Sequence, residues 1–184
     1  PIPDYFTGMK SSFEDKLIAD ENDANNGKYK VDYKVTGKNK SHKLIVGYIT
    51  NDGKVSISAN NCRTDFIPIQ PDTTYIASIS STDGVEWVTN KKHYSWFDKD
   101  KNFIQRDIVV NISCVSPSNA KYLIFHNAIV EGETYDITNV QVQIEEGTTA
   151  TTYEPYKESI KTLYLNSPLL EGDTIEQSGN NIIH

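Results

Sequence analysis

The sequence has few cysteines, few basic residues and no long apolar run. Its two cysteines, Cys62 and Cys114, are not part of a CxxC pair. They are interpreted as two buried thiols, with a disulfide in an oxidising compartment as the open alternative. No stretch approaches the roughly 18 apolar residues that span a bilayer, and no basic start leads into an apolar signal segment. These absences argue against a membrane protein.

Over the whole chain, basic residues are fewer than acidic ones. Lys and Arg total 18 against 25 Asp and Glu, which gives a net charge of -7 at pH 7. An acidic chain is poorly suited to sequence-independent binding of nucleic acid or of anionic membranes. We therefore expect neither as a partner, and a neutral or amphipathic partner fits better.

What the sequence does have is aromatic residues, with 11 Tyr, 6 Phe and 2 Trp in 184 residues. Large rings supply a core from few residues, and an aromatic-rich chain favours strands. The length suits one ordinary domain with an attached linker or tail. The chain also starts and stops abruptly, so we expect it to be a piece of a longer protein.

Two different periodicities divide the chain. Phe6, Met9, Phe13 and Leu17 are three or four residues apart, which predicts a short amphipathic helix within 3–20. From residue 28 onward apolar residues alternate with polar ones, which indicates half-buried strands. The predicted strands are 28–35, 44–50, 55–57, 65–69, 74–80, 85–88, 94–98, 102–104, 108–115, 122–128 and 136–145. The second and third of them are expected to form a hairpin that turns at Asn51-Asp52-Gly53.

Many short strands separated by turns predict an all-β fold, an antiparallel sandwich or barrel, and we favour a jelly-roll β-sandwich. The expected organisation is an N-terminal helix and linker at 1–27, the sandwich at 28–156, and a C-terminal extension at 157–184 towards a following domain.

Four segments carry a resemblance. They read DFIPIQPDTTY at 65–75, WFDKDKNFI at 96–104, PSNAKY at 117–122 and VQIEEGTTATTYEPY at 142–156. In this order they resemble the carbohydrate-binding-module-like β-sandwich domain of bacteriophage and prophage tail proteins, whether minor structural, baseplate or receptor-binding. The flanks DYFTGMKSSFED and LNSPLL resemble segments that adjoin such modules. The resemblance implies a jelly-roll fold, a place in the virion tail, and bacterial cell-surface saccharide and other tail proteins as partners.

This sequence departs from that family at a few positions. The family often has Pro where Thr152 stands and Arg where Leu123 or Ile124 stands. An altered ligand surface is therefore consistent with the resemblance.

No catalytic or metal-binding constellation is evident. The run from Asp98 to Asn102 opens like a calcium loop, but Phe103 stands where a Gly is required, so we interpret it as a hairpin turn. A structural calcium elsewhere stays open, and the histidines lack zinc-ligand spacing. Glu145 and Glu146 are adjacent on a strand and point to opposite faces, which does not suit paired acid and base. We expect a non-enzymatic protein without a cofactor.

A saccharide site needs a flat aromatic ring and a few polar groups for hydroxyls. The residues that supply these are Trp87, His93, Tyr94, Trp96, Arg106, His126 and Asn127. The alternative is that both Trp rings belong to the core, and that His126 and Asn127 lie on a solvated strand face. Tyr153 and Tyr156 are interpreted as packing residues at the edge of a sheet.

Three functions follow from these observations. The first is adhesion, in which a non-catalytic carbohydrate-binding module of a tail or receptor-binding protein holds a host surface glycan, with multivalency raising a weak affinity. The second is a structural spacer or assembly domain that binds no sugar and joins neighbours as a homo-oligomer such as a trimer. A glycan hydrolase is the weakest, because the pattern offers no carboxylate pair.

Overall fold

The computed structural model describes residues 16–19, 23–88, 92–109, 113–168, 176–178 and 181–183. Its regular elements are antiparallel strands, apart from one 3-10 turn at Ile137–Asn139. The predicted all-β class is confirmed. The chain divides into two compact units, one of 37–157 and one of 1–36 with 158–184. We call them the sandwich unit and the ribbon unit.

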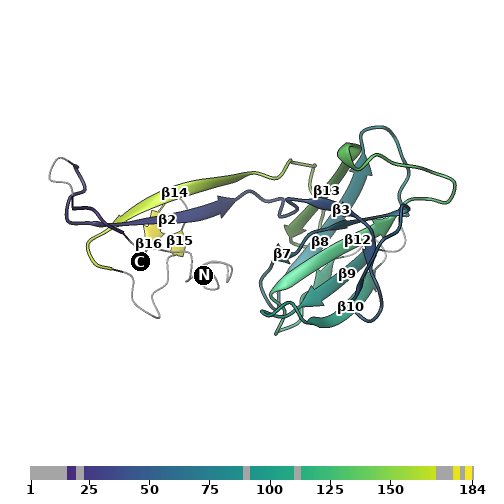
Figure 1. Cartoon of the computed structure of the whole chain (residues 1–184), viewed down its shortest axis with the longest axis horizontal. Helices are drawn as coiled ribbons and strands as arrows, with labels where there is room; N and C mark the ends of the chain where they lie inside the picture. The colour runs from purple at the N-terminus through teal and green to yellow at the C-terminus, as the bar shows by residue number, and fades with distance from the viewer. Residues whose placement is uncertain are drawn as a thin grey trace. The chain divides into compact units, whose positions relative to one another are not determined.

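The ribbon unit is built on two long strands. Strand β2 (Tyr29–Thr36) pairs along its whole length with β14 (Glu158–Leu165). Figure 1 shows the two strands side by side, with the short hairpin of β15 (Glu176–Ser178) and β16 (Asn181–Ile183) drawn in the same unit. The predicted sandwich started at residue 28, so the structure assigns its first strand to the ribbon unit instead.

The end of the predicted N-terminal helix is a strand. Residues 1–15 lie outside the described part of the chain, but Lys16–Leu17 forms β1, which pairs with Lys30 and Tyr29 of β2. The Ile18 amide donates to the carbonyl of Lys28 at 2.9 Å, which extends this pairing towards a turn at 23–27. The helix prediction is therefore wrong at these residues, because cross-strand hydrogen bonds replace the helical ones.

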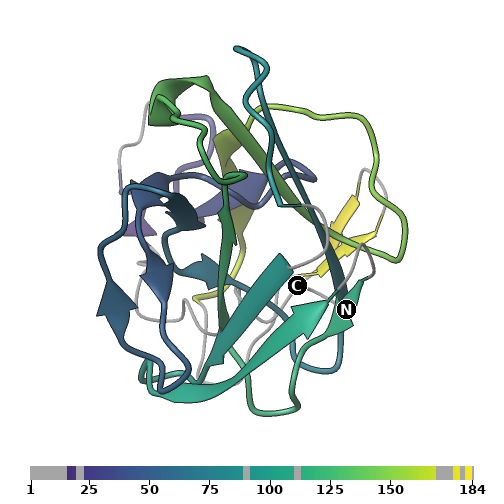
Figure 2. The ribbon, with the colours of Figure 1, turned by 90° about the vertical axis from the view of Figure 1, so that its right-hand side faces the viewer.

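The sandwich unit contains a larger and a smaller sheet. Figure 1 labels most of their strands, and Figure 2 shows the chain after a turn of 90°. The larger sheet has the order β10-β9-β12-β6-β3, with β7 also paired to β12. Its strands are β3 (Leu44–Val46), β6 (Asn61–Thr64), β7 (Ile67–Pro68), β9 (Lys92–Phe97), β10 (Phe103–Val109) and β12 (Tyr122–Ala128).

The smaller sheet has the order β11-β8-β13. Its strands are β8 (Thr74–Ser81), β11 (Cys114–Val115) and β13 (Val140–Glu146). A separate hairpin joins β4 (Tyr48–Ile49) to β5 (Val55–Ser56). Its turn contains Gly53 at a φ of 82°, as the Asp-Gly pair predicts.

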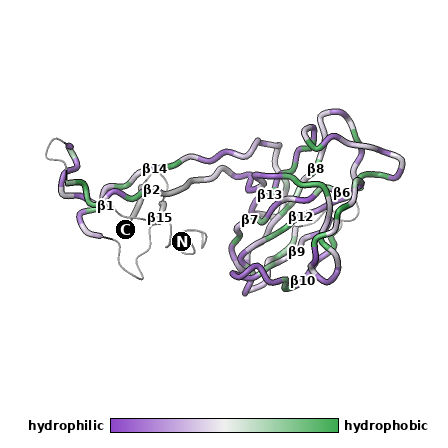
Figure 3. The backbone as a smooth tube through the Cα atoms, in the orientation of Figure 1, coloured by the Kyte–Doolittle hydropathy of each residue, from purple (hydrophilic) through white to green (hydrophobic). Residues whose placement is uncertain are grey.

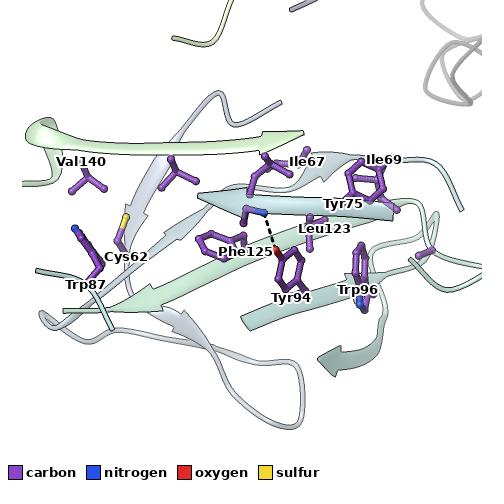
Figure 4. Packing of buried hydrophobic residues seen from close by; sticks show 14 of the residues in the cluster. Cys62, Ile67, Ile69, Tyr75, Trp87, Tyr94, Trp96, Leu123, Phe125 and Val140 are labelled. Carbon is purple, nitrogen blue, oxygen red and sulfur yellow. Dashed lines mark hydrogen bonds between the residues drawn. The ribbon is translucent and has the colours of Figure 1, made fainter. Parts of the chain in front are cut away.

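The main core lies between the two sheets. In Figure 4, Tyr94, Trp96, Leu123 and Phe125 of the larger sheet share one cluster with Tyr75 of the smaller sheet. The backbone amide of Ala77 donates to the Tyr94 hydroxyl at 2.8 Å, which links β8 to β9. Figure 3 shows hydrophobic colour along the strands of this unit and hydrophilic colour in many of its loops. A β-sandwich with its core between two sheets is therefore present, whereas its jelly-roll class stays a prediction.

A second cluster covers the opposite face of the larger sheet, which we call the outer face. Ile49 from the β4–β5 hairpin is fully buried together with Phe97 and Ile124. As a result, Tyr94 to Phe97 of β9 are all buried, although successive side chains of a strand point to opposite faces. The alternating pattern is therefore lost on this strand.

Several local predictions are confirmed. The loop from Asp98 to Asn102 is a hairpin turn, in which the Asp98 carboxylate accepts from the amides of Asp100 and Asn102 at 2.9 and 2.8 Å. Glu145 is buried and Glu146 exposed, as expected for adjacent residues of a strand. Cys62 is a buried free thiol, whereas Cys114 is free but only partly buried, so the prediction of two buried thiols is confirmed for Cys62 alone.

Candidate functional site

Three of the predicted ligand residues are core residues. Tyr94 and Trp96 are fully buried and Trp87 is 7% exposed, and all three belong to the cluster between the sheets. Trp96 donates its indole N–H to the Asp107 carboxylate at 2.6 Å, and the Trp87 ring meets the Tyr135 ring edge-on at 5.3 Å. A ring enclosed on both sides cannot stack on a sugar, so these three are corrected from ligand residues to packing residues.

Asn127 is also structural. It is 1% exposed, its amide group donates to the carbonyl of Val88 at 2.9 Å, and its side-chain oxygen accepts from the Ala128 amide at 2.9 Å. The prediction that Asn127 contacts a ligand is corrected for the same reason as the three aromatic residues. Its side chain satisfies buried backbone groups instead.

The remaining three predicted residues do come together, on the outer face of the larger sheet. His93 and His126 are directly opposite on β9 and β12, and their rings stack with centroids 4.3 Å apart and an interplanar angle of 10°. Arg106, on the neighbouring β10, donates from Nη1 to the carbonyl of Ile49 at 2.9 Å. Arg63 of β6 is directly opposite His126. We call Arg63, His93, Arg106 and His126 the histidine–arginine cluster.

His126 is the centre of this cluster, but at 2% exposed it is buried like Asn127. The prediction that it contacts a ligand is therefore corrected, and its ring supports the residues around it. Its Nδ1 accepts from the backbone amide of Ile49 at 3.5 Å, and the ring of Tyr48 is 5.9 Å away. Burial, followed by the nearby His93, Arg106 and Arg63, lowers the pKa of His126 from 6.5 to about 3. His126 is therefore neutral at neutral pH, and Arg63 and Arg106 give the cluster positive charge.

Sequence reasoning missed Arg63. It lies on β6, whose sequence Asn-Cys-Arg-Thr gives no apolar alternation, so no strand was predicted there. Only the register identifies it, because β6 pairs with β12 and so places Arg63 beside His126. Arg63 donates from Nη1 to the carbonyl of Thr64 at 3.1 Å.

A second feature of the outer face is aromatic. Phe66 and Tyr122 are partly exposed, with ring centroids 5.8 Å apart, and the ammonium group of Lys101 lies 4.7 and 5.4 Å from the centres of these two rings. Phe66 also meets Phe97 edge-on at 4.9 Å. We call Phe66, Lys101 and Tyr122 the aromatic patch. None of the three was among the predicted ligand residues.

The two features lie on the same face of the same strand. Tyr122, Ile124 and His126 are alternate residues of β12, so they point to one side of the sheet. Four residues of a strand span about 13 Å, which is on the order of a short oligosaccharide. Partly exposed aromatic rings at one end, and the partly exposed Arg63, Arg106 and His93 around His126 at the other, are the chemistry that a carbohydrate surface requires.

The described residues hold no candidate metal site. No group of three or more His, Cys, Asp or Glu residues among them could hold a metal ion. The buried carboxylate of Glu145 accepts from the Thr151 amide and hydroxyl and from Gln143, all within 2.8 Å. Among the described residues, no helix is long and apolar enough to cross a membrane.

Fold and site together define an antiparallel β-sandwich module with a polar and aromatic outer face. Its sequence is similar to the "Tail fiber protein" of Enterococcus phage phiEF24C, with 34% identity over 113 residues. The matched region is 60% of this chain but 6% of that protein, so the chain spans a small part of this relative's length. No family model matches the sequence, and no solved structure matches it.

Proposed function

We propose that the chain is part of a bacteriophage tail fibre and that its sandwich unit is a non-catalytic module that binds glycan on the host cell surface. The similarity to a phage tail fibre protein supports the place in the virion tail. The outer face of the larger sheet carries the proposal of glycan binding, because it combines partly exposed rings with hydrogen-bond donors. We further propose that the sandwich belongs to the jelly-roll class.

The proposed contacts follow from the chemistry of a sugar ring. The apolar face of a pyranose packs on an aromatic ring, which Tyr122 and Phe66 offer, and its hydroxyls accept from ammonium and guanidinium groups such as that of Lys101. A single shallow site of this kind binds weakly. Repeated copies in a tail raise the effective affinity, since linked sites bind with a high local concentration.

Catalysis is not part of the proposal. A glycosidase uses two carboxyl groups on opposite sides of one sugar bond. Neither the histidine–arginine cluster nor the aromatic patch includes an Asp or Glu, and Glu145, the buried acid among the described residues, belongs to the other sheet.

The test is a glycan array, followed by isothermal titration of the 184-residue chain with polysaccharides from Gram-positive cell walls. Tyr122→Ala should abolish or strongly weaken binding, whereas Tyr164→Ala, which removes a 45% exposed tyrosine from the ribbon unit, should leave it unchanged. Circular dichroism and thermal unfolding confirm that each variant is folded. Binding that survives in a folded Tyr122→Ala protein would contradict the proposed site.

A structural spacer or assembly domain is the second candidate, and chain order favours it. In sequence, the sandwich unit is inserted between β2 and β14, which pair with each other. The paired strands of the ribbon unit could therefore carry the connection to neighbouring parts of a fibre, with the sandwich unit as an attached domain. This function predicts self-association, for instance as a trimer, and no glycan binding. Sedimentation equilibrium together with the array separates the two candidates.

A further inference from the structure

Among the described residues, the arginines of the histidine–arginine cluster form no ion pair with an acid. Every Asp and Glu between residues 37 and 157 lies in a described range, and none forms an ion pair with Arg63 or Arg106. Their side chains donate to backbone carbonyls of Thr64 and Ile49 instead. In contrast, Lys38, Lys40, Lys43, Lys54 and Lys99 of the same unit each meet a carboxylate within 3.7 Å.

The donors at this place are incompletely satisfied. A guanidinium group carries five N–H donors, and the buried Nε of Arg63 has no hydrogen-bond partner among the described residues. The buried hydroxyl of Ser95 is in the same state, and in the sheet register Ser95 is directly opposite Arg106. Unpaired donors beside two positive charges suit a ligand that brings oxygen acceptors and negative charge.

The charged and polar groups of the cluster all act electrostatically on the ring of His126. His93, Arg106 and Arg63 each disfavour protonation of His126, so all three act on the position of its ring. No described carboxylate offsets them there. Although the whole chain carries a net charge of -7, screening in physiological salt confines the effect of distant acids to roughly 8 Å. The local charge at the cluster is therefore positive, although the chain as a whole is acidic. The net charge alone had suggested a neutral or amphipathic partner.

From these observations we infer that the histidine–arginine cluster binds a phosphate or carboxylate group of an anionic surface polysaccharide. The inference rests on the proposed glycan binding and specifies the class of glycan. Arg63 and Arg106 offer forked donors that match the oxygens of either anion, and the aromatic patch about 13 Å along β12 holds a neighbouring sugar unit.

The experiment titrates the 184-residue chain by isothermal calorimetry with three polymers and, as an anion without sugar, with inorganic polyphosphate. Poly(glycerol phosphate) tests phosphate, hyaluronan tests carboxylate, and dextran is the neutral comparison. Arg63→Gln should weaken binding of the preferred anionic polymer about tenfold, and Arg63→Lys, which keeps the charge but loses the fork, should weaken it less. Lys99→Gln removes a charge from a 78% exposed lysine of the same unit and should change nothing.

The outcomes separate this inference from the proposed function. Tighter binding of one anionic polymer that falls with added salt and with Arg63→Gln supports the inference, and the polymer identifies the anion. Equal binding of dextran, unaffected by Arg63→Gln, overturns the inference and leaves glycan binding intact. If inorganic polyphosphate binds as tightly as the polymers and Tyr122→Ala does not change its binding, the anion site stands but glycan binding is overturned. If nothing binds, both fail.

Discussion

The imidazole rings of His93 and His126 stack at 4.3 Å on neighbouring strands of the larger sheet. Stacked imidazoles tolerate at most one positive charge between them at this distance, because two like charges repel strongly in a partly buried site. Since His126 is the buried member of the pair, it is the ring that stays neutral. This relationship makes the stability of the sandwich unit sensitive to acid.

The first prediction concerns pH. The pKa of His126 is about 3 in the folded protein and near 6.5 when unfolded, so below pH 6.5 the unfolded chain binds a proton that the folded chain does not. The free energy of unfolding should therefore fall as the pH drops from 6.5 towards 3, by about 1.4 kcal/mol per pH unit. Urea unfolding at several pH values measures this slope. A His126→Gln protein with the same slope as the parent would contradict it.

The second prediction concerns Trp96. Replacing it with Phe removes the hydrogen bond to Asp107 and leaves a small cavity between the sheets. We expect a loss of about 2–4 kcal/mol in the free energy of unfolding. Urea titration followed by the fluorescence of the remaining Trp87 measures it. A loss below about 1 kcal/mol would show that the Trp96 ring does not occupy the core.

Two glycines with similar backbone angles provide a matched pair. Gly53 and Gly84 have φ of 82° and 83°, but a Cβ at Gly53 would lie 2.2 Å from the Phe103 ring, whereas a Cβ at Gly84 would meet nothing within 4 Å. Gly84→Ala should cost about 1 kcal/mol from backbone strain alone. Gly53→Ala should cost about 1–3 kcal/mol more, because Phe103 must move. Equal losses in thermal unfolding would argue against the packing of the β4–β5 hairpin on Phe103.

Glu145 and Glu146 form a second matched pair. Glu145 accepts three hydrogen bonds from Thr151 and Gln143, whereas Glu146 pairs with Lys40 at the surface. Glu145→Ala should cost about 2–3 kcal/mol, because the part-buried amide and hydroxyl of Thr151 lose their acceptor, and Glu146→Ala less than about 1 kcal/mol. Chemical unfolding compares them. Similar losses for both variants would show that the Glu145 network is not buried.

The cysteines supply a chemical test. Burial raises the pKa of Cys62 and of Cys114 to about 12, so few thiolates form near pH 8. The native protein should react slowly with a disulfide reagent such as DTNB, and the unfolded protein should release two equivalents at once. Fewer than two equivalents after unfolding without reductant would indicate that the two residues form a disulfide.

Local signals predicted the elements whose residues determine their own conformation. The Asp-Gly turn at Gly53 and the carboxylate-capped turn after Asp98 form as expected, because short-range hydrogen bonds and backbone angles specify them. Strand β10 was predicted as two pieces, 102–104 and 108–115. It runs instead from Phe103 to Val109, with an irregular register near Gln105 that interrupts the apolar pattern.

The candidate site was less predictable. Whether Trp87 and Trp96 are buried depends on which side of the chain faces the smaller sheet. For Trp96 the sequence of β9 does not reveal that side, because the β4–β5 hairpin buries the opposite face of this strand as well. Arg63 and Tyr122 become part of a surface only through the pairing of β6, β12 and β9. Such register is set by contacts between segments far apart in sequence.

The two ends of the sandwich unit meet at one hydrogen bond, from the Gly37 amide to the Lys157 carbonyl at 2.9 Å. A unit whose ends are adjacent can replace the turn of an antiparallel strand pair without spreading the strands, which is the geometry that domain insertion tolerates. Residues 37–157 therefore form a unit that can be inserted into, or exchanged within, a pair of antiparallel strands. Recombination that joins a different unit to the same pair of strands would replace the proposed binding surface and leave the pairing of β2 with β14 unaltered.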